Sequence, residues 1–427
     1  MKMRGFFFLL PVLGFCQILT VSEITHRGNT LTKDYIITRE IQHPLDAPLD
    51  SSLAEEDLYR LLNLGIFAEV KWRAIPLENM TVRLEYEIME NNKFFGGRFI
   101  GGPSPAYDEE TGWSYGAGGG FKNFRGRNER IGGGFAFGGR NTFGISYFNP
   151  WITGDHVSLN VSLAKLDFHH PYLPYDVKIK SIEMNVGRFF GYERKMSIGF
   201  ELEDMDFVSD SMILNYQYLA PQGYFHYDTR DLYANPTQGI LIKQAFFGRI
   251  NLKGEIKNNY VWLQSFSVYK RLSKLDNAKP WILAVGIKTQ SNFGDKDQNF
   301  LAAMGEAGSV RGWRYPRHLN YNDPNQIYRF GFHNLKSTVE LRKVVVPRFP
   351  LQELYEFGIT VGAFIDWGVT SQTDFSDMFG MRPVIGTGVT VQLQMPFVLV
   401  LRLEYGYGFY DGNQIDSAFH LAIGHQI

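Results

Sequence analysis

The N-terminal part of the chain mixes two hydrophobic periods. The pattern predicts a strand at 20–27, helices within 32–41 and 53–64, and strands at 67–75 and 81–89. In the last of these, apolar Val82, Leu84 and Tyr86 alternate with polar side chains, as in a strand with one buried face. The order β-α-α-β-β is typical of a small α+β domain, which we place at residues 17–92.

After about residue 93 the helical period disappears, and short alternating strands continue to the end of the chain. Apolar Val157 and Leu159, for example, alternate with polar Ser158 and Asn160. Residues 93–427 would supply sixteen strands at roughly 21 residues per strand and connection, although twelve or fourteen strands also fit. Alternation alone suits a globular β-sandwich as well as a transmembrane β-barrel.

The composition favours the barrel. Aromatic residues make up 15% of the chain, and girdles of aromatic side chains are typical of barrel strands at the two bilayer interfaces. The 43 basic and 44 acidic residues leave a formal net charge of -1, without the basic excess of a nucleic-acid-binding protein. A single cysteine excludes an intrachain disulfide and a cysteine-based zinc site.

The first sixteen residues have the pattern of a secretory signal peptide. Met1 to Arg4 is basic, and Gly5 to Cys16 is mostly apolar but too short to span a bilayer. We expect cleavage after Cys16; a lipid-modified cysteine is the less favoured alternative, because bulky Phe15 precedes it. No later stretch approaches ~18 uninterrupted apolar residues, so membrane crossing would require a β-barrel.

Two motifs, one in the N-terminal domain and one at residues 225–239, resemble those of known protein families. Gly28 and Asn29 at a turn, with Leu64, Gly65 and Phe67 after the second helix, resemble polypeptide-transport-associated (POTRA) domains, although any β-α-α-β-β domain could contain them. Residues 225–239 resemble a charged signature between barrel strands of the BamA-type outer-membrane assembly and secretion superfamily, although a plain charged hairpin turn is the alternative. The matching residues of this signature are Asp228, Thr229, Arg230, Asp231, Pro236 and Gly239.

Two more motifs match the same family. The loop motif comprises Val310, Arg311, Gly312 and Trp313, and the strand motif comprises Phe364, Asp366 and Gly368. The first falls in a long loop expected at residues 291–336, where a solvent-exposed Arg311 is the simpler interpretation. An arginine carried into a barrel needs a carboxylate, because an unpaired buried charge is strongly unfavourable. We therefore expect Arg311 to meet Asp366 in the lumen, with Glu340 nearby.

The resemblance implies a mainly β fold, with a transmembrane antiparallel barrel of the surface-antigen type at residues 93–427 behind one periplasmic POTRA domain. It implies a non-enzymatic protein that inserts or translocates proteins at the outer membrane, without a cofactor. The implied partners are outer-membrane lipid, unfolded or secreted polypeptide chains and accessory envelope proteins, and not nucleic acid. A dedicated two-partner-type secretion pore and a surface antigen with a passive structural role are the alternatives.

The two ends of such a barrel should meet at a weak seam. We expect the first strand near residues 113–121 and the last near 419–426, where residues 419–427 also resemble the family's terminal β-signal. Gly116, Gly118 and Gly120 lie in this first strand, and each interior glycine weakens a strand by roughly 0.5–1 kcal/mol relative to alanine. The alternative is that these glycines only relieve crowding.

The other candidate sites give weaker indications of function. His169 and His170 are adjacent and precede a proline, so they offer no metal-binding face and we expect a loop there. Asp228 and Asp231 have no nucleophile or base set around them in the sequence. The glycine clusters at 118–120 and 132–134 precede no helix, as a phosphate-binding loop would require, so we expect them in strands. Neither catalysis nor a bound metal is expected.

Overall fold

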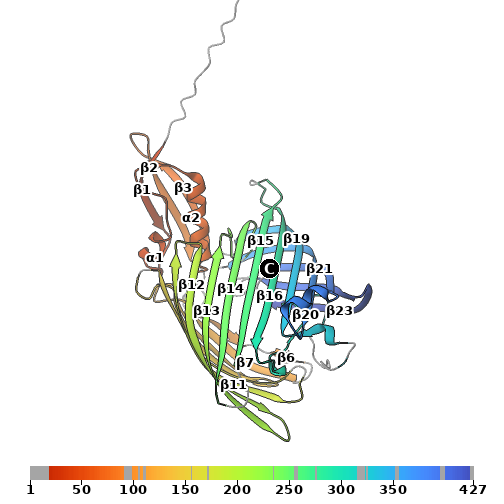
Figure 1. The fold of residues 1–427 in the computed structure, drawn as a ribbon. Coiled ribbons are helices and arrows are strands. Elements are labelled where there is room, and N and C mark those ends of the chain that lie inside the picture. Colours follow the sequence, from red (N-terminus) through yellow and green to blue (C-terminus); the bar gives the residue numbers. More distant parts are fainter. Residues whose placement is uncertain are drawn as a thin grey trace, which may run out of the picture.

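The chain forms a small N-terminal domain and a large β-barrel (Figure 1). The computed structural model describes residues 19–90, 99–103, 106–108, 112–154, 156–170, 173–233, 235–253, 258–274, 277–314, 323, 326–351, 355–394 and 400–423. The expected signal peptide at 1–16, the expected domain boundary at 92–93 and the end of the expected terminal motif at 424–427 lie outside the described residues.

The N-terminal domain has the predicted order of elements, with one short strand added. Its elements are β1 (Thr20–Arg27), α1 (Asp34–Thr38), β2 (Ala47–Pro48), α2 (Ser51–Asn63), β3 (Phe67–Pro76) and β4 (Thr81–Glu90). The sheet order is β2-β1-β4-β3, in which β1 and β4 run parallel and β3 and β4 antiparallel. The helix α2 begins where the Asp50 side chain accepts hydrogen bonds from the amides of Ser52 and Leu53.

The buried face of β4 forms the core of this domain, as the alternation predicts. Val82, Leu84 and Tyr86 are completely buried against α2 and the neighbouring strands. The one fully buried acid, Asp57 of α2, accepts hydrogen bonds from the Tyr86 hydroxyl and from backbone amides, so its burial is compensated. Among the described residues, no helix combines the length and apolar character needed to cross a membrane.

Sixteen antiparallel strands close the barrel. They are β5 (Ile100–Pro103) with β6 (Ala106–Asp108), β7 (Gly112–Phe124), β8 (Glu129–Gly138), β9 (Asn141–Asn149), β10 (Val157–His169), β11 (Asp176–Phe190), β12 (Arg194–Val208), β13 (Ile213–Asp228), β14 (Gly239–Lys253), β15 (Asn259–Arg271), β16 (Trp281–Gly294), β19 (His333–Leu351), β20 (Tyr355–Ser371), β21 (Val384–Gln394), β22 (Leu401–Tyr410) and β23 (Asn413–Ile423). We count β5 and β6 as one interrupted strand, because both pair with β7.

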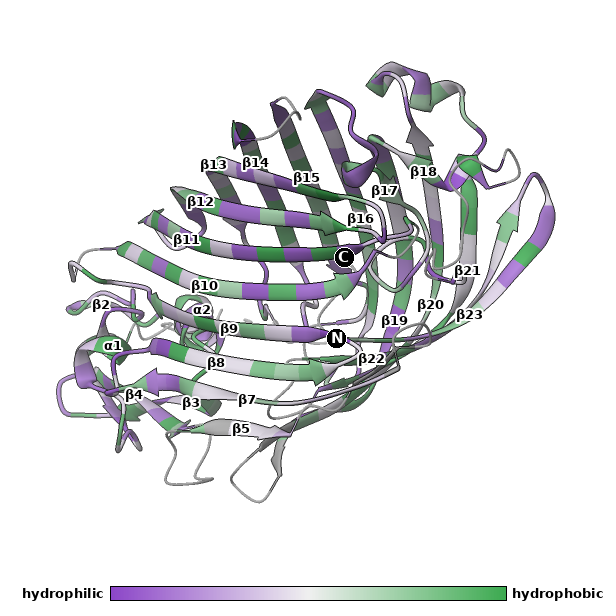
Figure 2. Cartoon of the chain, turned by 90° about the horizontal axis from the view of Figure 1, so that it is seen from below, coloured by the Kyte–Doolittle hydropathy of each residue, from purple (hydrophilic) through white to green (hydrophobic). Residues whose placement is uncertain are grey.

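The outer and inner faces of the barrel differ in polarity. On β12, Met196, Ile198 and Phe200 are exposed on the outside, and Ile198 retains 74% of its accessible surface. Ser197 and Gly199 alternate with them and face inward, which gives the banded hydropathy along the strands in Figure 2. An apolar outer face and a polar inner face are what a barrel in lipid requires.

The seam of the barrel differs from the sequence prediction. The strand expected to be first, at 113–121, is β7, and β5 and β6 lie between it and β23. The short stretch Ile100–Pro103 contains two glycines and a proline, so it shows no hydrophobic alternation. Gly116, Gly118 and Gly120 therefore belong to the second strand. A Cβ atom at Gly116 would stand 2.1 Å from the Phe135 carbonyl oxygen, so this glycine permits a close approach of β7 and β8.

Candidate functional site

The long connection between β16 and β19 packs against the inner wall of the barrel. It spans residues 295–332, shorter than the predicted 291–336, because β16 continues to Gly294 and β19 already begins at His333. Two 3-10 turns, Gln298–Phe300 and Ile327–Arg329, flank its ends. A two-stranded sheet of β17 (Ala302–Ala303) and β18 (Phe330–Gly331) joins them.

Arg311 of this connection is the centre of a buried ion-pair network. Its side chain is fully buried, and it donates from Nε and Nη2 to the two Asp366 oxygens at 2.8 Å each. Its backbone amide also donates to Asp366, at 2.9 Å. Nη1 donates to Glu404 at 2.7 Å and lies 3.6 Å from a Glu340 oxygen. The guanidinium stacks 3.6 Å from the Phe364 ring centroid. The predicted contact with Asp366, with Glu340 nearby, is confirmed.

The charges of the network balance. Its three carboxylates and three guanidiniums are those of Asp366, Glu340, Glu404, Arg311, Arg342 and Arg402. Arg342 donates to Glu340 at 3.1 Å, and Arg402 donates to Glu404 at 3.0 Å. Because every member is almost completely buried, removing one charge would leave the opposite charges uncompensated. We call these six residues the lumen clamp.

The two residues after Arg311 fix the path of the loop backbone. Gly312 has φ +85°, and a Cβ atom there would lie 2.6 Å from the Tyr407 carbonyl oxygen, so only glycine fits without strain. Its amide donates to His420 Nε2 at 3.0 Å. The Trp313 indole donates to the Ile385 carbonyl oxygen at 2.9 Å. Backbone and side chain together therefore attach the loop motif to β21, β22 and β23.

Glycines in the wall make room for this motif. A Cβ atom at Gly386 would stand 1.8 Å from the Arg311 carbonyl oxygen, and one at Gly408 would stand 2.7 Å from the Trp313 ring. Val310 is fully buried and lies beside Gly386. The glycines of β21 and β22 thus form a trough in which the loop lies directly on the strand backbones.

Sequence patterns alone did not identify Glu404, Arg402 or His420 as part of this site. A signal for the first two was present, because Arg402 and Glu404 share the polar face of an alternating strand. A charged pair on the inner face of one barrel strand implies a partner on another strand. The identity of that partner depends on strand register, which alternation does not supply.

The charged signature at 225–239 forms the β13–β14 turn. Asp228 and Arg230 make a two-pronged ion pair at 2.8 and 2.7 Å. Asp231 accepts hydrogen bonds from the Thr237 amide and from its hydroxyl. Gly239 has φ +110°, which favours glycine. The two aspartates therefore stabilise a turn. Thr229 bonds across the turn to Ile240, and Pro236 is buried.

This turn contacts the N-terminal domain. The Asn63 side chain, at the end of α2, donates to the Asp231 carbonyl oxygen at 3.0 Å and accepts from the Tyr233 amide at 2.9 Å. On the next turn, between β11 and β12, the Tyr192 hydroxyl donates to the Arg39 carbonyl oxygen at 2.8 Å. The domain therefore docks on the hairpin turns at one mouth of the barrel, as Figure 1 shows.

Two buried charges lie at the same contact. The Arg39 guanidinium stacks 4.1 Å from the Trp151 ring and donates from Nε to Glu40 at 3.1 Å. Burial raises the pKa of the Glu40 carboxyl, and the charge of Arg39 offsets only part of that effect. The β9–β10 turn, which carries Trp151, thus adds a third attachment point.

The predicted POTRA residues have structural roles inside the domain. Gly28 has φ +98°, and a Cβ atom there would collide with the Ile88 carbonyl oxygen. The Asn29 side chain donates to the Thr32 carbonyl oxygen at 2.9 Å, which closes the turn before α1. Leu64 and Gly65 end α2, where Gly65 takes φ +69°, and Phe67 is fully buried.

The remaining candidates stay structural. His169 ends β10 and contacts Asp176 through Nδ1 at 3.1 Å, whereas His170 lies in the following turn, so the expected loop begins one residue later. The glycines at 118–120 and 132–134 lie in strands, as predicted, and the two clusters pair with one another in β7 and β8. Within the described ranges, no group of three histidine, cysteine or acidic side chains could hold a metal ion.

Known proteins share this architecture. Residues 123–427 match the family model described as the Omp85 superfamily domain. BamA from Haemophilus ducreyi, lacking POTRA domains 1–3, is 18% identical and superposes with a TM-score of 0.56 over 95% of this chain and 84% of its own. CdiB from Acinetobacter baumannii is 13% identical, with a TM-score of 0.55 over 95% of this chain and 74% of its own.

Proposed function

Since the chain belongs to the Omp85 superfamily, we propose that it inserts or translocates polypeptide chains at the outer membrane, and that its N-terminal domain is a periplasmic POTRA domain that receives them. The observation that carries this proposal is the position of a small β-sheet at the mouth of a barrel with a polar inner wall. The domain contacts hairpin turns at one end of the barrel, and the long connection 295–332 starts from the opposite end. In barrels of this kind the longer loops belong to the extracellular end.

The N-terminal sheet offers an edge for an incoming chain. Strand β3 lies at one end of the sheet and, in the described part of the chain, pairs only with β4. An extended peptide can add to such an edge through main-chain hydrogen bonds, which require no particular sequence. At the start of β3, Arg348 of the barrel donates to the Ala68 carbonyl oxygen at 2.9 Å. A chain paired with β3 would therefore be delivered directly to the barrel mouth.

Depletion of the protein, followed by quantitative proteomics of the cell envelope, tests this function. We expect a broad loss of outer-membrane β-barrel proteins, because their insertion would lack its catalyst. Loss of a single secreted protein, with the other barrels unchanged, would instead assign a dedicated two-partner-type secretion pore. An unchanged envelope would contradict polypeptide handling altogether and would leave a passive structural role.

A further inference from the structure

The register of six neighbouring strands places five basic side chains in one row. Each of the following pairs consists of directly opposite residues: Lys195 and His226, His226 and Lys243, Lys243 and Ser265, Ser265 and Lys288, and Lys288 and Lys336. The row therefore crosses β12, β13, β14, β15, β16 and β19, and only Ser265 interrupts it. We call Lys195, His226, Lys243, Lys288 and Lys336 the basic row.

The basic row lies on the inner wall. Directly opposite residues of antiparallel strands project to the same face of the sheet, whereas sequence neighbours project to the other face. The neighbours Met196 and Ile287 are 51% and 42% exposed on the apolar outside of the barrel. Lys195 and Lys288 must therefore point inward. Because directly opposite residues share one face of the sheet, the other members of the row point inward as well.

Part of the lysine charge of the row has no ion pair in the described structure. Like charges directly opposite one another destabilise a sheet. Among the described residues, no ion pair within 4.0 Å involves Lys195, Lys243 or Lys336. Lys195 lies instead 5.3 Å from the Phe148 ring and 5.0 Å from the Phe189 ring. The nearby Asp228 is already paired with Arg230, and Lys336 faces an acid, Glu306 of the long loop.

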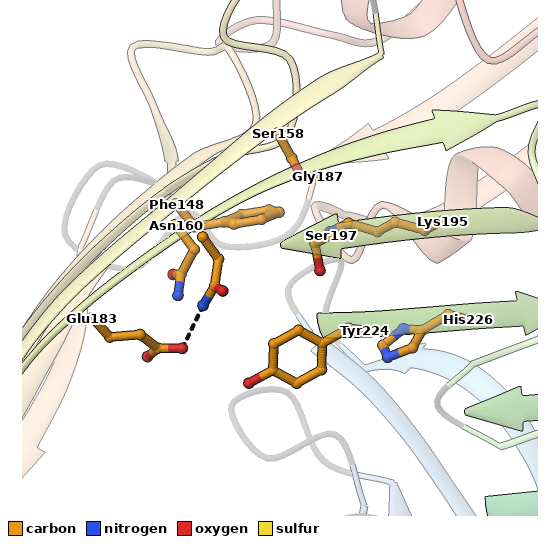
Figure 3. A pocket seen from close by; sticks show the side chains of 10 residues that line it. Phe148, Ser158, Asn160, Glu183, Gly187, Lys195, Ser197, Tyr224 and His226 are labelled. Carbon is orange, nitrogen blue, oxygen red and sulfur yellow. Dashed lines mark hydrogen bonds between the residues drawn. The ribbon is translucent and has the colours of Figure 1, made fainter. Parts of the chain in front are cut away.

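One end of the basic row opens into a cavity. The cavity has a volume of about 240 Å³, and Lys195, His226, Ser197 and Tyr224 contribute to its lining. Figure 3 shows Lys195 and His226 on neighbouring strands at one side of it, with Glu183 at the other side. Space beside the lysine is therefore available to a ligand.

Because the row crosses the strands and barrel strands are tilted, it runs obliquely around the inner wall, from the mouth that contacts the N-terminal domain towards the other end. It begins at Lys195, next to the β11–β12 turn that contacts the N-terminal domain, and it ends at Lys336, near the start of β19 beside the long loop. Strands lie about 4.8 Å apart, so the five steps cover about 24 Å. In an extended peptide, side chains on the same face repeat every ~6.6 Å, a spacing that flexible lysine side chains can meet.

We propose that the basic row binds acidic segments of an extended polypeptide as it passes from the N-terminal domain into the barrel. This inference rests on the proposed function and adds a preference for substrate charge. Carboxylates on the passing chain would pair with lysines of the row, and each contact would be weak enough to be released for the next. Arg311 and Arg402 are not part of the row, because the lumen clamp already neutralises them.

Peptide binding to the purified full-length protein in lipid nanodiscs tests the row. The probes are a fluorescent 16-residue peptide of alternating Glu and Ser and its Lys–Ser counterpart, at low salt. We expect the wild-type protein to bind the Glu–Ser peptide preferentially. The fourfold variant K195Q/K243Q/K288Q/K336Q should bind it about tenfold more weakly, because it loses four weak ion pairs, each contributing several tenths of a kcal/mol. Four Lys→Arg substitutions should retain binding.

A matched control removes four lysines from the outer face, where the alternation places exposed Lys165, Lys178, Lys180 and Lys270. Changing these four to glutamine should leave binding unchanged. Equal binding by the wild-type protein and the row variant, or equal binding of the two peptides, would overturn the proposal. Tighter row-dependent binding of inorganic polyphosphate than of the Glu–Ser peptide would overturn a polypeptide as the occupant.

Complementation separates this inference from the proposed function. If depletion changes no envelope protein, the proposed function fails, whatever the peptide binding shows. If depletion removes envelope proteins and the row variant restores every one of them, acidic segments included, the function stands and the basic row is wrong. The result that we expect is restoration of barrels with few acidic residues and poor restoration of acidic ones.

Discussion

At the scale of single residues, Arg311 decides where the long loop lies. Replacing it with alanine would leave three buried carboxylates facing two arginines. Breaking such a buried pair costs about 3–5 kcal/mol. We expect Arg311→Ala to release the loop, so that limited proteolysis cleaves within residues 295–314 at protease concentrations that leave the wild-type protein intact. Arg314→Ala is the control, because the Arg314 side chain is 75% exposed. Equal cleavage of all three proteins would show that the clamp does not hold the loop.

A second residue-scale prediction concerns pH and Glu90. Its carboxylate accepts hydrogen bonds from the amides of Thr30, Leu31 and Thr32, which hold the segment before α1. Burial alone would raise the pKa of Glu90, but these hydrogen bonds lower it below its ordinary value. A depressed folded-state pKa stabilises the fold above the unfolded-state pKa, and this contribution is lost as the pH falls through the folded-state value.

We therefore expect the exchange protection of these three amides to fall between pH 6 and pH 3, after correction for intrinsic exchange rates. Glu90→Gln should be less protected at pH 6 and should change little over the same range. Hydrogen exchange with mass spectrometry on the full chain measures both. Parallel pH dependence in the two proteins would assign the effect to another group.

Some contacts of the lumen clamp could be inferred from the sequence alone. Arg311, Asp366 and Glu340 could be brought together because a buried arginine demands a carboxylate, and because alternation sets which face of a strand each acid occupies. Glu404 could not be added on the same grounds. Its place beside Arg311 depends on how β20, β21 and β22 pair, and a shift of two residues in register would preserve every hydrophobic face.

At the scale of elements, long alternating strands were predictable and short glycine-rich ones were not. β12 is recognisable from four outward apolar residues at alternate positions, whereas β5 and β6 together contain few side chains that could show hydrophobic alternation. The basic row could not be predicted from the sequence, for a different reason. Its members are far apart in the chain, and only the pairing of six strands aligns them.

The corrected seam gives an element-scale prediction. In the described part of the chain, β5 and β6 contribute four and three residues to the first strand, which lies beside β23. If the seam opens to admit a chain, cross-linking it should stop activity. Cys substitution at Gly102, combined in turn with single cysteines along Asn413–Ile423, should yield oxidised pairs that no longer complement depletion. Reduction should restore complementation, and a paired cysteine across β11 and β12 is the control. Full activity of the locked seam would exclude it as a gate.

At the scale of the whole molecule, three features lie along one path. The N-terminal sheet contributes the edge strand β3, the barrel mouth that contacts this domain leads to the basic row, and the lumen clamp holds the long loop against the barrel wall. The family match and the barrel agree with the sequence-based expectation of an outer-membrane assembly or secretion protein. Charge sets the two sides of the lumen apart, because the clamp is neutral whereas the basic row is not.

Site-specific photo-cross-linking in living cells tests the passage of polypeptides most directly. A photoreactive amino acid at Ser197 faces the lumen, and the same amino acid at the next position, Ile198, faces the outside. We predict polypeptide adducts from Ser197, increased when outer-membrane protein synthesis is induced, and none from Ile198. If the probes at Ser197 and Ile198 capture no polypeptide, and a probe on β3 captures none either, the proposed passage of polypeptides is contradicted.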